Sequence, residues 1–471
     1  MQINKKITTP IADFVRRYAE SDMTRLHMPG HKGQSFLGCE AWDITEIGGA
    51  DSLYEADGII AESEEHATAL FGSGRTVFST EGSSQCIRAM LYLAMMHGRS
   101  RSRFAGSKGA ENNSAKGNTG KRPVVLAARN VHKAFIYAVT LLDIDVIWLW
   151  PEEQVSSICS CVISPAQVER VLRECQEKEV IAIYLTSPNY LGAQADIRGI
   201  AEVCHDNDVI LAVDNAHGAY LKFLEDSQHP LDLGADICCD SAHKTLPVLT
   251  GGAYLQISKD APSVFAEQAK YAMELFGSTS PSYLTMVSLD LCNRYLAEQY
   301  AERLKDFIEL RNRCCRELEA RGWRVMESDP LKITVEIPKG ILSRELKQVL
   351  REQGIECEYA DQNYMVFMLT PENTAQDLER LILAFGRNPH SYEEREYLTI
   401  ASAQQVMSVR EAMFSVPETV TLDEAENRIC RVPTVSCPPA IPIAVPGELI
   451  TKEMIEVFRY YGIMQLDVVK E

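Results

Sequence analysis

Short apolar runs alternate with helical or loop segments between about residues 123 and 257. The runs are PVVLAA, VIWLW, VIAIYLTSP, DVILAVD, ADICCD and GGAYLQI. Unbroken runs of this length, rich in β-branched residues, are typical of strands that are buried on both faces, and such strands form parallel sheets covered by helices. One covering helix begins after Ser164 as N-cap, with Pro165 at its first position. We therefore expect an α/β core with a mainly parallel sheet.

The pattern changes after residue 280. A helical period runs from Pro281 for about 38 residues and indicates one long helix, either straight or kinked. The stretch LKITVEI (331–337) alternates strictly between apolar and polar residues, which predicts a strand with one solvent-facing side. A helix from Ser343 and a strand at YMVFML complete a small α+β domain. The proline-rich stretch 432–448 is unsuited to a helix or a central strand, and a closing amphipathic helix follows it.

These changes of pattern divide the 471-residue chain into four parts. We expect an N-terminal arm over 1–50, a large domain over 51–310, a small α+β domain over 311–390 and a C-terminal subdomain over 391–471. The segment AGSKGAENNSAKGNTGK (105–121) has almost nothing to bury, so we expect a surface loop there.

The net charge argues against nucleic acids and anionic membranes as partners. The formal net charge is −19, whereas nucleic acids and anionic membranes are bound by basic surfaces. No run is long enough for a membrane helix, and the first twenty residues do not resemble a signal peptide, so we expect a cytoplasmic protein that binds a small molecule. The fourteen cysteines lack the spacing of a zinc site, so we expect buried free thiols and no metal.

Polar clusters follow several of the apolar runs. Gly82, Ser83 and Ser84 open a helix and could hold an anion such as phosphate, although such a turn is more often only an N-cap. His132 lies at a strand-to-helix junction, where an imidazole is usually structural but could also stack on a flat ring. The turn TSPNYLG (186–192) follows another strand and is equally consistent with a plain turn.

Two further clusters carry charge. Asp214 ends an apolar strand, where a buried carboxylate needs a partner. Ser241, His243 and Lys244 follow the next apolar strand, so Asp214 and Lys244 could face one pocket. A phosphate cradle, a stacking imidazole, a carboxylate for a ring nitrogen and a lysine for an aldehyde are what pyridoxal phosphate requires. The alternative is a buried ion pair between Asp214 and Lys244.

With these stretches in this order, the sequence resembles the Orn/Lys/Arg decarboxylases of the aspartate-aminotransferase fold (fold type I), in their short bacterial form. The similar stretches span nearly the whole chain: RLHMPGHKG (25–33), DITEIGGADSLYEADGIIAESEEHATALFGS (43–73), RNVHK, TSPNYLG, DNAHGA, SAHKT, STSPSY (278–283) and PPAIPIAVPGE (438–448). The resemblance implies a seven-stranded, mainly parallel sheet and a pyridoxal phosphate cofactor. It also implies a homodimer or larger oligomer with the active site at the interface.

The resemblance also implies a role for each matching residue. Lys244 would form the Schiff base, Asp214 would pair with the ring nitrogen and His132 would stack on the ring. Gly82, Ser83 and Ser84 would hold the phosphate, with Thr279 or Ser280 reaching the phosphate of the neighbouring subunit. The remaining residues expected around the cofactor are Ala216, His217, Ser241 and His243.

The implied activity is decarboxylation of a basic L-amino acid, arginine, lysine or ornithine, to the polyamine-type amine and CO2. Lys244 or a neighbouring histidine such as His243 would return a proton. An aminotransferase or lyase acting on another amino acid remains an alternative, as does an inactive regulatory homologue.

Three positions depart from the family pattern, and three others are candidates for substrate recognition. Asn215 and Tyr220 stand within a stretch that commonly reads DEAHGAH, and Ala440 stands where glycine is usual. Glu356, Glu358 and Asp361 are candidates for binding the distal cation of the substrate, although a solvated loop explains them equally well.

Overall fold

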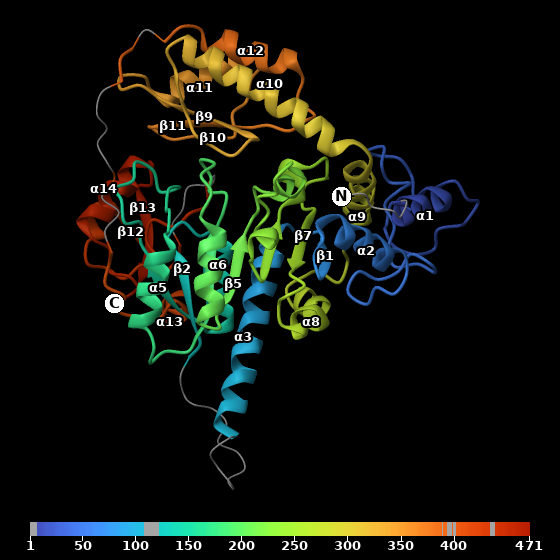
Figure 1. Ribbon diagram of the computed structural model, residues 1–471, viewed down its shortest axis with the longest axis horizontal. Coiled ribbons are helices and arrows are strands. Elements are labelled where there is room, and N and C mark those ends of the chain that lie inside the picture. The colour runs from blue at the N-terminus through green and yellow to red at the C-terminus, as the bar shows by residue number, and fades with distance from the viewer. Residues whose placement is uncertain (1–6, 108–121, 389, 393–397, 399–401, 434–438) are drawn as a thin grey trace. The chain divides into compact units, whose positions relative to one another are not determined.

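The computed structural model describes residues 7–107, 122–388, 390–392, 398, 402–433 and 439–471 (Figure 1). The chain forms two compact units. Met1–Ser114 and Cys204–Leu304 make up the first, and Ala115–Val203 and Lys305–Glu471 make up the second. The expected division of the chain into four parts differs from this one and stays a prediction.

A seven-stranded sheet forms the α/β core, in the order β1-β7-β6-β5-β4-β2-β3. Its strands are β1 (Arg75–Ser79), β2 (Val124–Ala128), β3 (Asp145–Leu149), β4 (Val180–Thr186), β5 (Ile210–Asp214), β6 (Ile237–Asp240) and β7 (Ala253–Ile257). β7 is antiparallel to β1 and β6, whereas β5 with β6, and β2 with β3 and β4, are parallel. The predicted mainly parallel sheet is thus confirmed, and each of the six apolar runs overlaps one of its strands.

Helices precede or follow the strands of the sheet in both units. In the second unit, α5 (Pro165–Glu174) has Ser164 as its N-cap, whose side chain accepts from the Gln167 amide, as predicted. The second unit also holds α4 (Lys133–Leu142), and α6 (Ile197–Asp206) follows β4. In the first unit, α3 (Ser83–Ser107) and α8 (Ser263–Glu274) pack against each other. Because α3 continues to Ser107, the predicted loop is wrong for residues 105–107, and its remainder, 108–121, lies outside the described residues.

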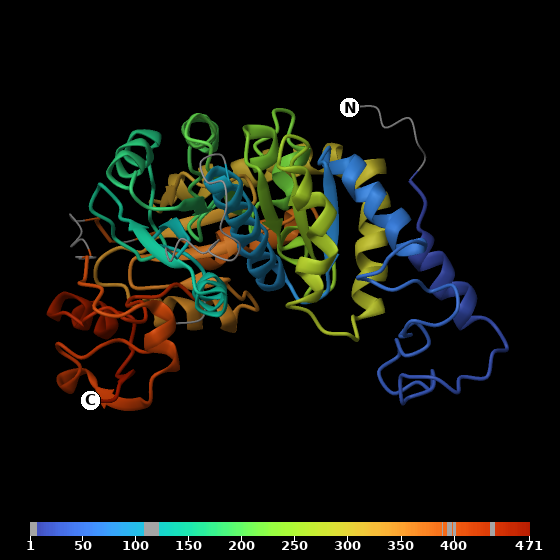
Figure 2. The ribbon, with the colours of Figure 1, turned by 90° about the horizontal axis from the view of Figure 1, so that it is seen from below.

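Three helices of the first unit meet around one buried carboxylate. α1 (Pro10–Ala19), α2 (Ile59–Phe71) and α9 (Tyr283–Tyr295) contact one another (Figure 2). Asp290 of α9 accepts from the Ala12 amide of α1 at 2.9 Å and from the Ser63 hydroxyl of α2 at 2.6 Å. Its side chain is fully buried. Asp290 therefore holds the N-terminal helix against the rest of the unit.

Asp290 should make stability depend on pH. Burial raises its pKa from 3.8 to about 6, because the charged form is poorly solvated there. Between about pH 4 and pH 6 the folded state then binds more protons than the unfolded state, so the stability due to Asp290 falls as pH rises. Compared with Asp290→Asn, which cannot ionise, the wild type should lose about 3 kcal/mol of unfolding free energy from pH 3.5 to pH 7.

Urea denaturation of the two proteins across this range measures the effect. Because all other titrating groups are shared, the difference between the two curves isolates Asp290. Parallel stability curves would contradict the prediction.

The predicted long helix is confirmed in outline. α9 is followed by one π-helical turn, η3 (Leu296–Tyr300), and then by α10 (Ala301–Ala320). Such turns insert one residue into an α-helix, which a helical sequence period does not reveal.

A four-stranded sheet in the order β10-β11-β9-β8 forms the small α+β domain of the second unit. Its strands are β8 (Arg324–Met326), β9 (Lys332–Glu336), β10 (Tyr359–Ala360) and β11 (Tyr364–Met368). α10, α11 (Ser343–Glu352) and α12 (Ala375–Phe385) lie on one side of this sheet (Figure 1). The predicted strands and the helix from Ser343 are confirmed.

The predicted solvent-facing side of β9 is wrong, because all five of its residues are buried. The Lys332 amine donates to the Asp329 carboxylate at 2.5 Å. The Thr334 hydroxyl donates to the Leu191 carbonyl at 2.8 Å. The polar side of β9 is therefore covered, with hydrogen-bond partners that its sequence alternation does not disclose.

The C-terminal part of the second unit holds a two-stranded ribbon of β12 (Pro417–Thr421) and β13 (Gln465–Val469). α13 (Val409–Phe414) and α14 (Lys452–Tyr460) accompany it. α14 is the predicted closing helix, and the described residues of the proline-rich stretch form no helix. β13 was not predicted.

Two observations concern the described residues as a whole. Their cysteines are all free thiols, and only Cys39 among them is exposed. None of the helices in these ranges is both long enough and apolar enough to span a membrane.

Candidate active site

Three turns of the first unit lie at one edge of the sheet. β7 is antiparallel to both β1 and β6, so β1 runs parallel to β6, which is itself parallel to β5. The carboxyl ends of β1, β5 and β6 therefore share an edge. The predicted residues Ser83, Asp214 and Lys244 follow these three ends, which is where open α/β sheets bind ligands.

Lys244 lies in a single helical turn, α7 (Ala242–Thr245), which starts directly after Ser241. Its amide donates to the Ser241 carbonyl at 3.0 Å. Its amine Nζ lies 3.0 Å from Nε2 of His217. The structure thus brings the predicted lysine together with a predicted histidine from the turn after β5.

The turn after β1 approaches the lysine turn closely. Gly82, with φ +72°, donates its amide to the Gly251 carbonyl at 2.7 Å. The Ser241 hydroxyl donates to the Ser83 hydroxyl at 2.9 Å. Gly251 has φ +97°, and a Cβ there would lie 2.7 Å from the Thr80 carbonyl oxygen, so only glycine suits this position.

The same turn opens α3, whose N-terminus presents backbone amides and the positive end of the helix dipole. Ser83 and Ser84, the first two residues of α3, are both half-buried. A Cβ on Gly82 would meet one atom within 4 Å, the Ser84 amide nitrogen at 4.0 Å. This open space beside two hydroxyls and a helix N-terminus suits a phosphate group.

Asp214, the last residue of β5, is buried. Its Oδ1 accepts from the Ala216 amide at 3.2 Å and from the Cys239 thiol at 3.6 Å. A protonated ring nitrogen is a suitable partner for a buried carboxylate, because the opposite charges compensate each other's desolvation. Lysine, carboxylate and helix N-terminus together fit the aldehyde, ring nitrogen and phosphate of pyridoxal phosphate.

His243 is neutral at physiological pH. Burial lowers its pKa below 6.5. Its Nδ1 lies 2.9 Å from the Gly252 carbonyl oxygen, so Nδ1 carries the hydrogen and donates it there. The predicted proton return by His243 stays a prediction, and so does that by Lys244, whose amine contacts His217.

His132 belongs to the second unit, where it is the N-cap of α4. Its Nδ1 accepts from the Ala134 amide at 3.1 Å, which places the hydrogen of a neutral ring on Nε2. The capping bond fixes the ring orientation, as a residue that stacks on a flat ligand requires. The stacking itself stays a prediction.

The turn before His132 is anchored by Arg129, which sequence reasoning did not single out. The buried Arg129 guanidinium pairs with Glu448 at 3.3 Å and donates to the carbonyls of Pro442 and Ile443, both at 2.9 Å. Its Cζ also lies 5.2 Å from the ring centroid of Trp148 and 5.1 Å from that of Trp150. Arg129 thus ties the proline-rich stretch to the end of β2.

Ala440 of this stretch is strained. It is buried with φ +60°, a left-handed conformation that favours glycine, and its carbonyl accepts from the Lys133 amide at 3.0 Å. Relief of this strain outweighs the larger chain entropy of glycine, so Ala440→Gly should raise the unfolding free energy by about 0.5–1 kcal/mol. Denaturant unfolding checks this, with Ala444→Gly in the same stretch as control. A destabilised Ala440→Gly protein would contradict the assignment of strain.

Thr279 and Ser280 are exposed in the first unit. The neighbouring Ser278 amide donates to the Glu81 carboxylate, beside the turn after β1. The two residues are thus accessible to another molecule, as an intersubunit role requires, and that role stays a prediction.

The three acidic candidates for the distal cation differ. Asp361 is buried and accepts five hydrogen bonds, from the amides of Asn363 and Tyr364 and the hydroxyls of Tyr359, Ser157 and Tyr461. Glu356 pairs with Arg351 at 2.9 Å. Glu358 is exposed and accepts from the Tyr190 hydroxyl. Glu358, beside the turn that follows β4, is therefore the best placed of the three for a cationic ligand.

The fold of the chain is fold type I, the aspartate-aminotransferase fold. Two solved structures share it over 98% of this chain: lysine decarboxylase A from Pseudomonas aeruginosa (TM-score 0.78, 80% of that chain covered) and the Francisella novicida lysine decarboxylase LdcF (TM-score 0.77, 81% covered). Both are 16% identical to it in sequence.

The chain belongs to the Orn/Lys/Arg decarboxylase family. Residues 104–336 match the major domain of that family and residues 392–467 match its C-terminal domain. An arginine decarboxylase of Bacillus subtilis is 26% identical over 95% of this chain and 92% of its own length. An arginine decarboxylase of Halalkalibacterium halodurans is also 26% identical, over 97% and 94%. The expected family, fold, enzyme class and cofactor are thereby confirmed.

Proposed function

We propose that this enzyme decarboxylates L-arginine, with Lys244 as the residue that attaches the cofactor. The contact between the Lys244 amine and Nε2 of His217, 3.0 Å apart beside the α3 N-terminus, carries the assignment of the lysine. The arginine decarboxylases that match over most of both chains favour arginine above lysine and ornithine.

Each residue of the candidate site has a proposed part. Bound pyridoxal phosphate supplies a conjugated ring that accepts the electron pair left when CO2 departs. Asp214 keeps the ring nitrogen protonated, while Gly82, Ser83 and Ser84 hold the phosphate at the α3 N-terminus. Ser241 positions Ser83 through their hydrogen bond. The backbone of Ala216 orients the Asp214 carboxylate.

Proton return falls to Lys244. Its amine delivers a proton to the α-carbon of the substrate, and His217 holds the amine in place through its Nε2. The neutral His243 supports the lysine turn through its bond to Gly252. His132 is the proposed stacking residue, and its capping bond fixes the orientation of its ring.

Glu358 is the proposed partner of the distal guanidinium. Its carboxylate is exposed, and the Tyr190 hydroxyl orients it. A planar guanidinium binds a carboxylate by two parallel hydrogen bonds, which the ammonium of lysine or ornithine does not form.

We also propose a homodimer or larger oligomer in the cytoplasm. Large apolar side chains are highly exposed along residues 23–37, namely Met23, Leu26, Met28, Phe36 and Leu37. Monomers rarely expose such a run, so a second copy is its expected cover. The free thiols are in keeping with a reducing compartment.

A screen of amino acids tests the activity. The protein loaded with pyridoxal phosphate is given L-arginine, L-lysine, L-ornithine and D-arginine, and CO2 is measured. We expect release from L-arginine at the highest kcat/KM. Release from another basic amino acid would correct the substrate, and a cofactor-loaded protein without CO2 release would point to another pyridoxal phosphate reaction.

A further inference from the structure

A second carboxylate, Asp240, lies fully buried at the end of β6. Asp214 is paired with Cys239 in the sheet, and their side chains touch on one face. Because side chains alternate along a strand, Asp240 and Cys238 point to the opposite face. The Asp240 carboxylate therefore lies on the opposite face of the sheet from the Asp214 carboxylate.

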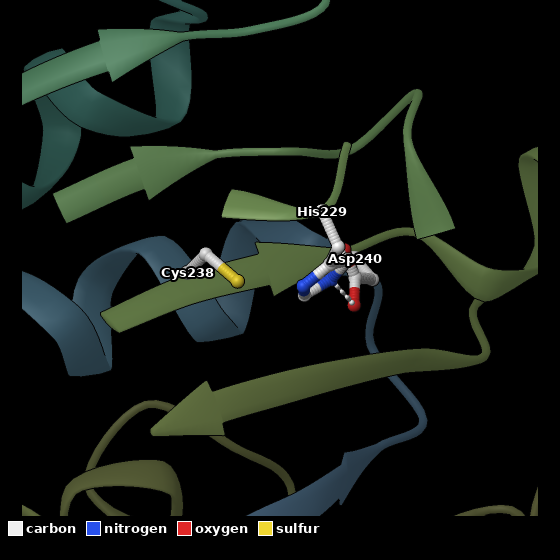
Figure 3. Close-up of side chains that lie close together, drawn as sticks. All are labelled: His229, Cys238 and Asp240. Carbon is white, nitrogen blue, oxygen red and sulfur yellow. Dashed lines mark hydrogen bonds and ion pairs between the residues drawn. The ribbon is translucent and has the colours of Figure 1, made fainter. Parts of the chain in front are cut away.

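Three nitrogen donors surround the Asp240 carboxylate. Asn215 Nδ2 lies 2.6 Å from Oδ1, and Gln256 Nε2 lies 3.0 Å from Oδ2. His229 Nε2 lies 3.2 Å from Oδ2, and the two side chains point toward each other in Figure 3. His229 Nδ1 accepts from the Leu231 amide, so Nε2 is the ring nitrogen that donates to Asp240.

Hydrogen bonds explain the cluster better than a metal ion does. Ligand atoms of His229, Cys238 and Asp240 lie within 4.8 Å of one another. However, the three donors already occupy the Asp240 carboxylate. Burial also raises the pKa of the Cys238 thiol well above 9.0, which keeps it protonated, and metals bind the thiolate.

Asn215 connects Asp240 to the turn that carries Asp214 and His217. Its amide donates to the Cys239 carbonyl at 3.0 Å, and its carbonyl accepts from Gly218 at 2.8 Å. A Cβ at Gly218 would lie 2.0 Å from Oδ1 of Asn215, so the side chain fills the space that glycine leaves. The backbone and the side chain of Asn215 are thus both held in place, and its Nδ2 is directed at the Asp240 carboxylate.

Asp240 also begins the other turn, since Ser241 follows it and Lys244 comes four residues after it. One buried carboxylate thus joins the turn after β5, which holds Asp214 and His217, to the turn after β6, which holds Lys244. Hydrogen bonds to a buried charge are stronger than neutral ones and define geometry well.

We propose that Asp240 is a positioning residue that, through Asn215, sets the placement of Asp214 and His217 relative to Lys244 from the rear face of the sheet. This role rests on the proposed functions of Lys244 and Asp214.

Exchanging the two polar groups tests the contact. Asn215→Asp sets two carboxylates against each other and should weaken pyridoxal phosphate binding about a hundredfold. Asp240→Asn removes the charged acceptor and should weaken it about tenfold. The double variant Asn215→Asp/Asp240→Asn restores one amide facing one carboxylate, so it should bind at least about tenfold more tightly than Asn215→Asp alone. Asp226→Asn, an exposed change, is the matched control.

Two measurements besides activity are compared across the variants. These are the dissociation constant of pyridoxal phosphate and the pH midpoint of the visible absorbance of the bound cofactor. Asp240→Asn should shift this midpoint, and the control should leave both quantities unchanged. Should Asp240→Asn fail to fold, the comparison of Asn215→Asp with the double variant decides alone, because both contain the aspartate at 215.

Purely additive effects of the two changes, or wild-type affinity and midpoint in a folded Asp240→Asn protein, would overturn the proposal. Neither result would contradict the proposed function, since the wild type would still bind the cofactor and release CO2. A wild type that binds pyridoxal phosphate without releasing CO2 would instead overturn the proposed function and leave this test intact.

Discussion

Lys244→Ala is expected to lower kcat with L-arginine by about 10⁴-fold, because the variant has lost both the cofactor attachment and the proposed proton donor. Steady-state CO2 release measures the loss. The visible absorbance of the bound cofactor should disappear as well. The exposed Lys259→Ala is the matched control and should retain both activity and absorbance.

A small amine shows whether Lys244→Ala has lost only the reacting amine or has also lost its fold. Methylamine added to Lys244→Ala supplies the missing amine, and we expect it to restore part of the rate. Activity near that of the wild type in Lys244→Ala, without added amine, would contradict the role of the lysine.

Asp214→Asn should lower kcat by about 10³-fold, because a buried, charged partner of the ring nitrogen is replaced by a neutral amide. The amide keeps the shape of the side chain, so KM should change little. Pyridoxal phosphate should also bind more weakly. Stopped-flow and steady-state assays with saturating cofactor measure the two kinetic parameters.

The conservative change Asp214→Glu keeps the charge and serves as the control, with a smaller expected loss. A fall of equal size in both variants would show that shape, and not charge, matters at this position. A wild-type kcat in Asp214→Asn would contradict the proposed pairing with the ring nitrogen.

The core of the fold could be predicted from sequence because its signals are local. Each of six apolar runs overlaps a strand, and the Ser164–Pro165 pair marks the start of α5. Strand β9 shows the limit of such signals. Its alternating residues predicted a solvent-facing side, yet Lys332 and Thr334 are buried against partners, one of which is distant in sequence. Alternation reports polarity, whereas burial depends on tertiary contacts.

The candidate site was predictable to the extent that its residues follow strand ends. Ser83, His217, Ser241 and Lys244 were singled out, and the structure places them in contact through two hydrogen bonds. The supporting cluster around Asp240 was not predicted, although ADICCD places this carboxylate at the end of an apolar strand. Its partners His229 and Gln256 come from other elements, and pairing of that kind leaves no spacing signal in the sequence.

Borohydride reduction shows directly which lysine attaches the cofactor. The wild-type protein with bound pyridoxal phosphate is reduced with borohydride, digested and analysed by mass spectrometry. We predict a phosphopyridoxyl group on the peptide that contains Lys244. The same modification on another lysine, with Lys244 unmodified, would contradict the account.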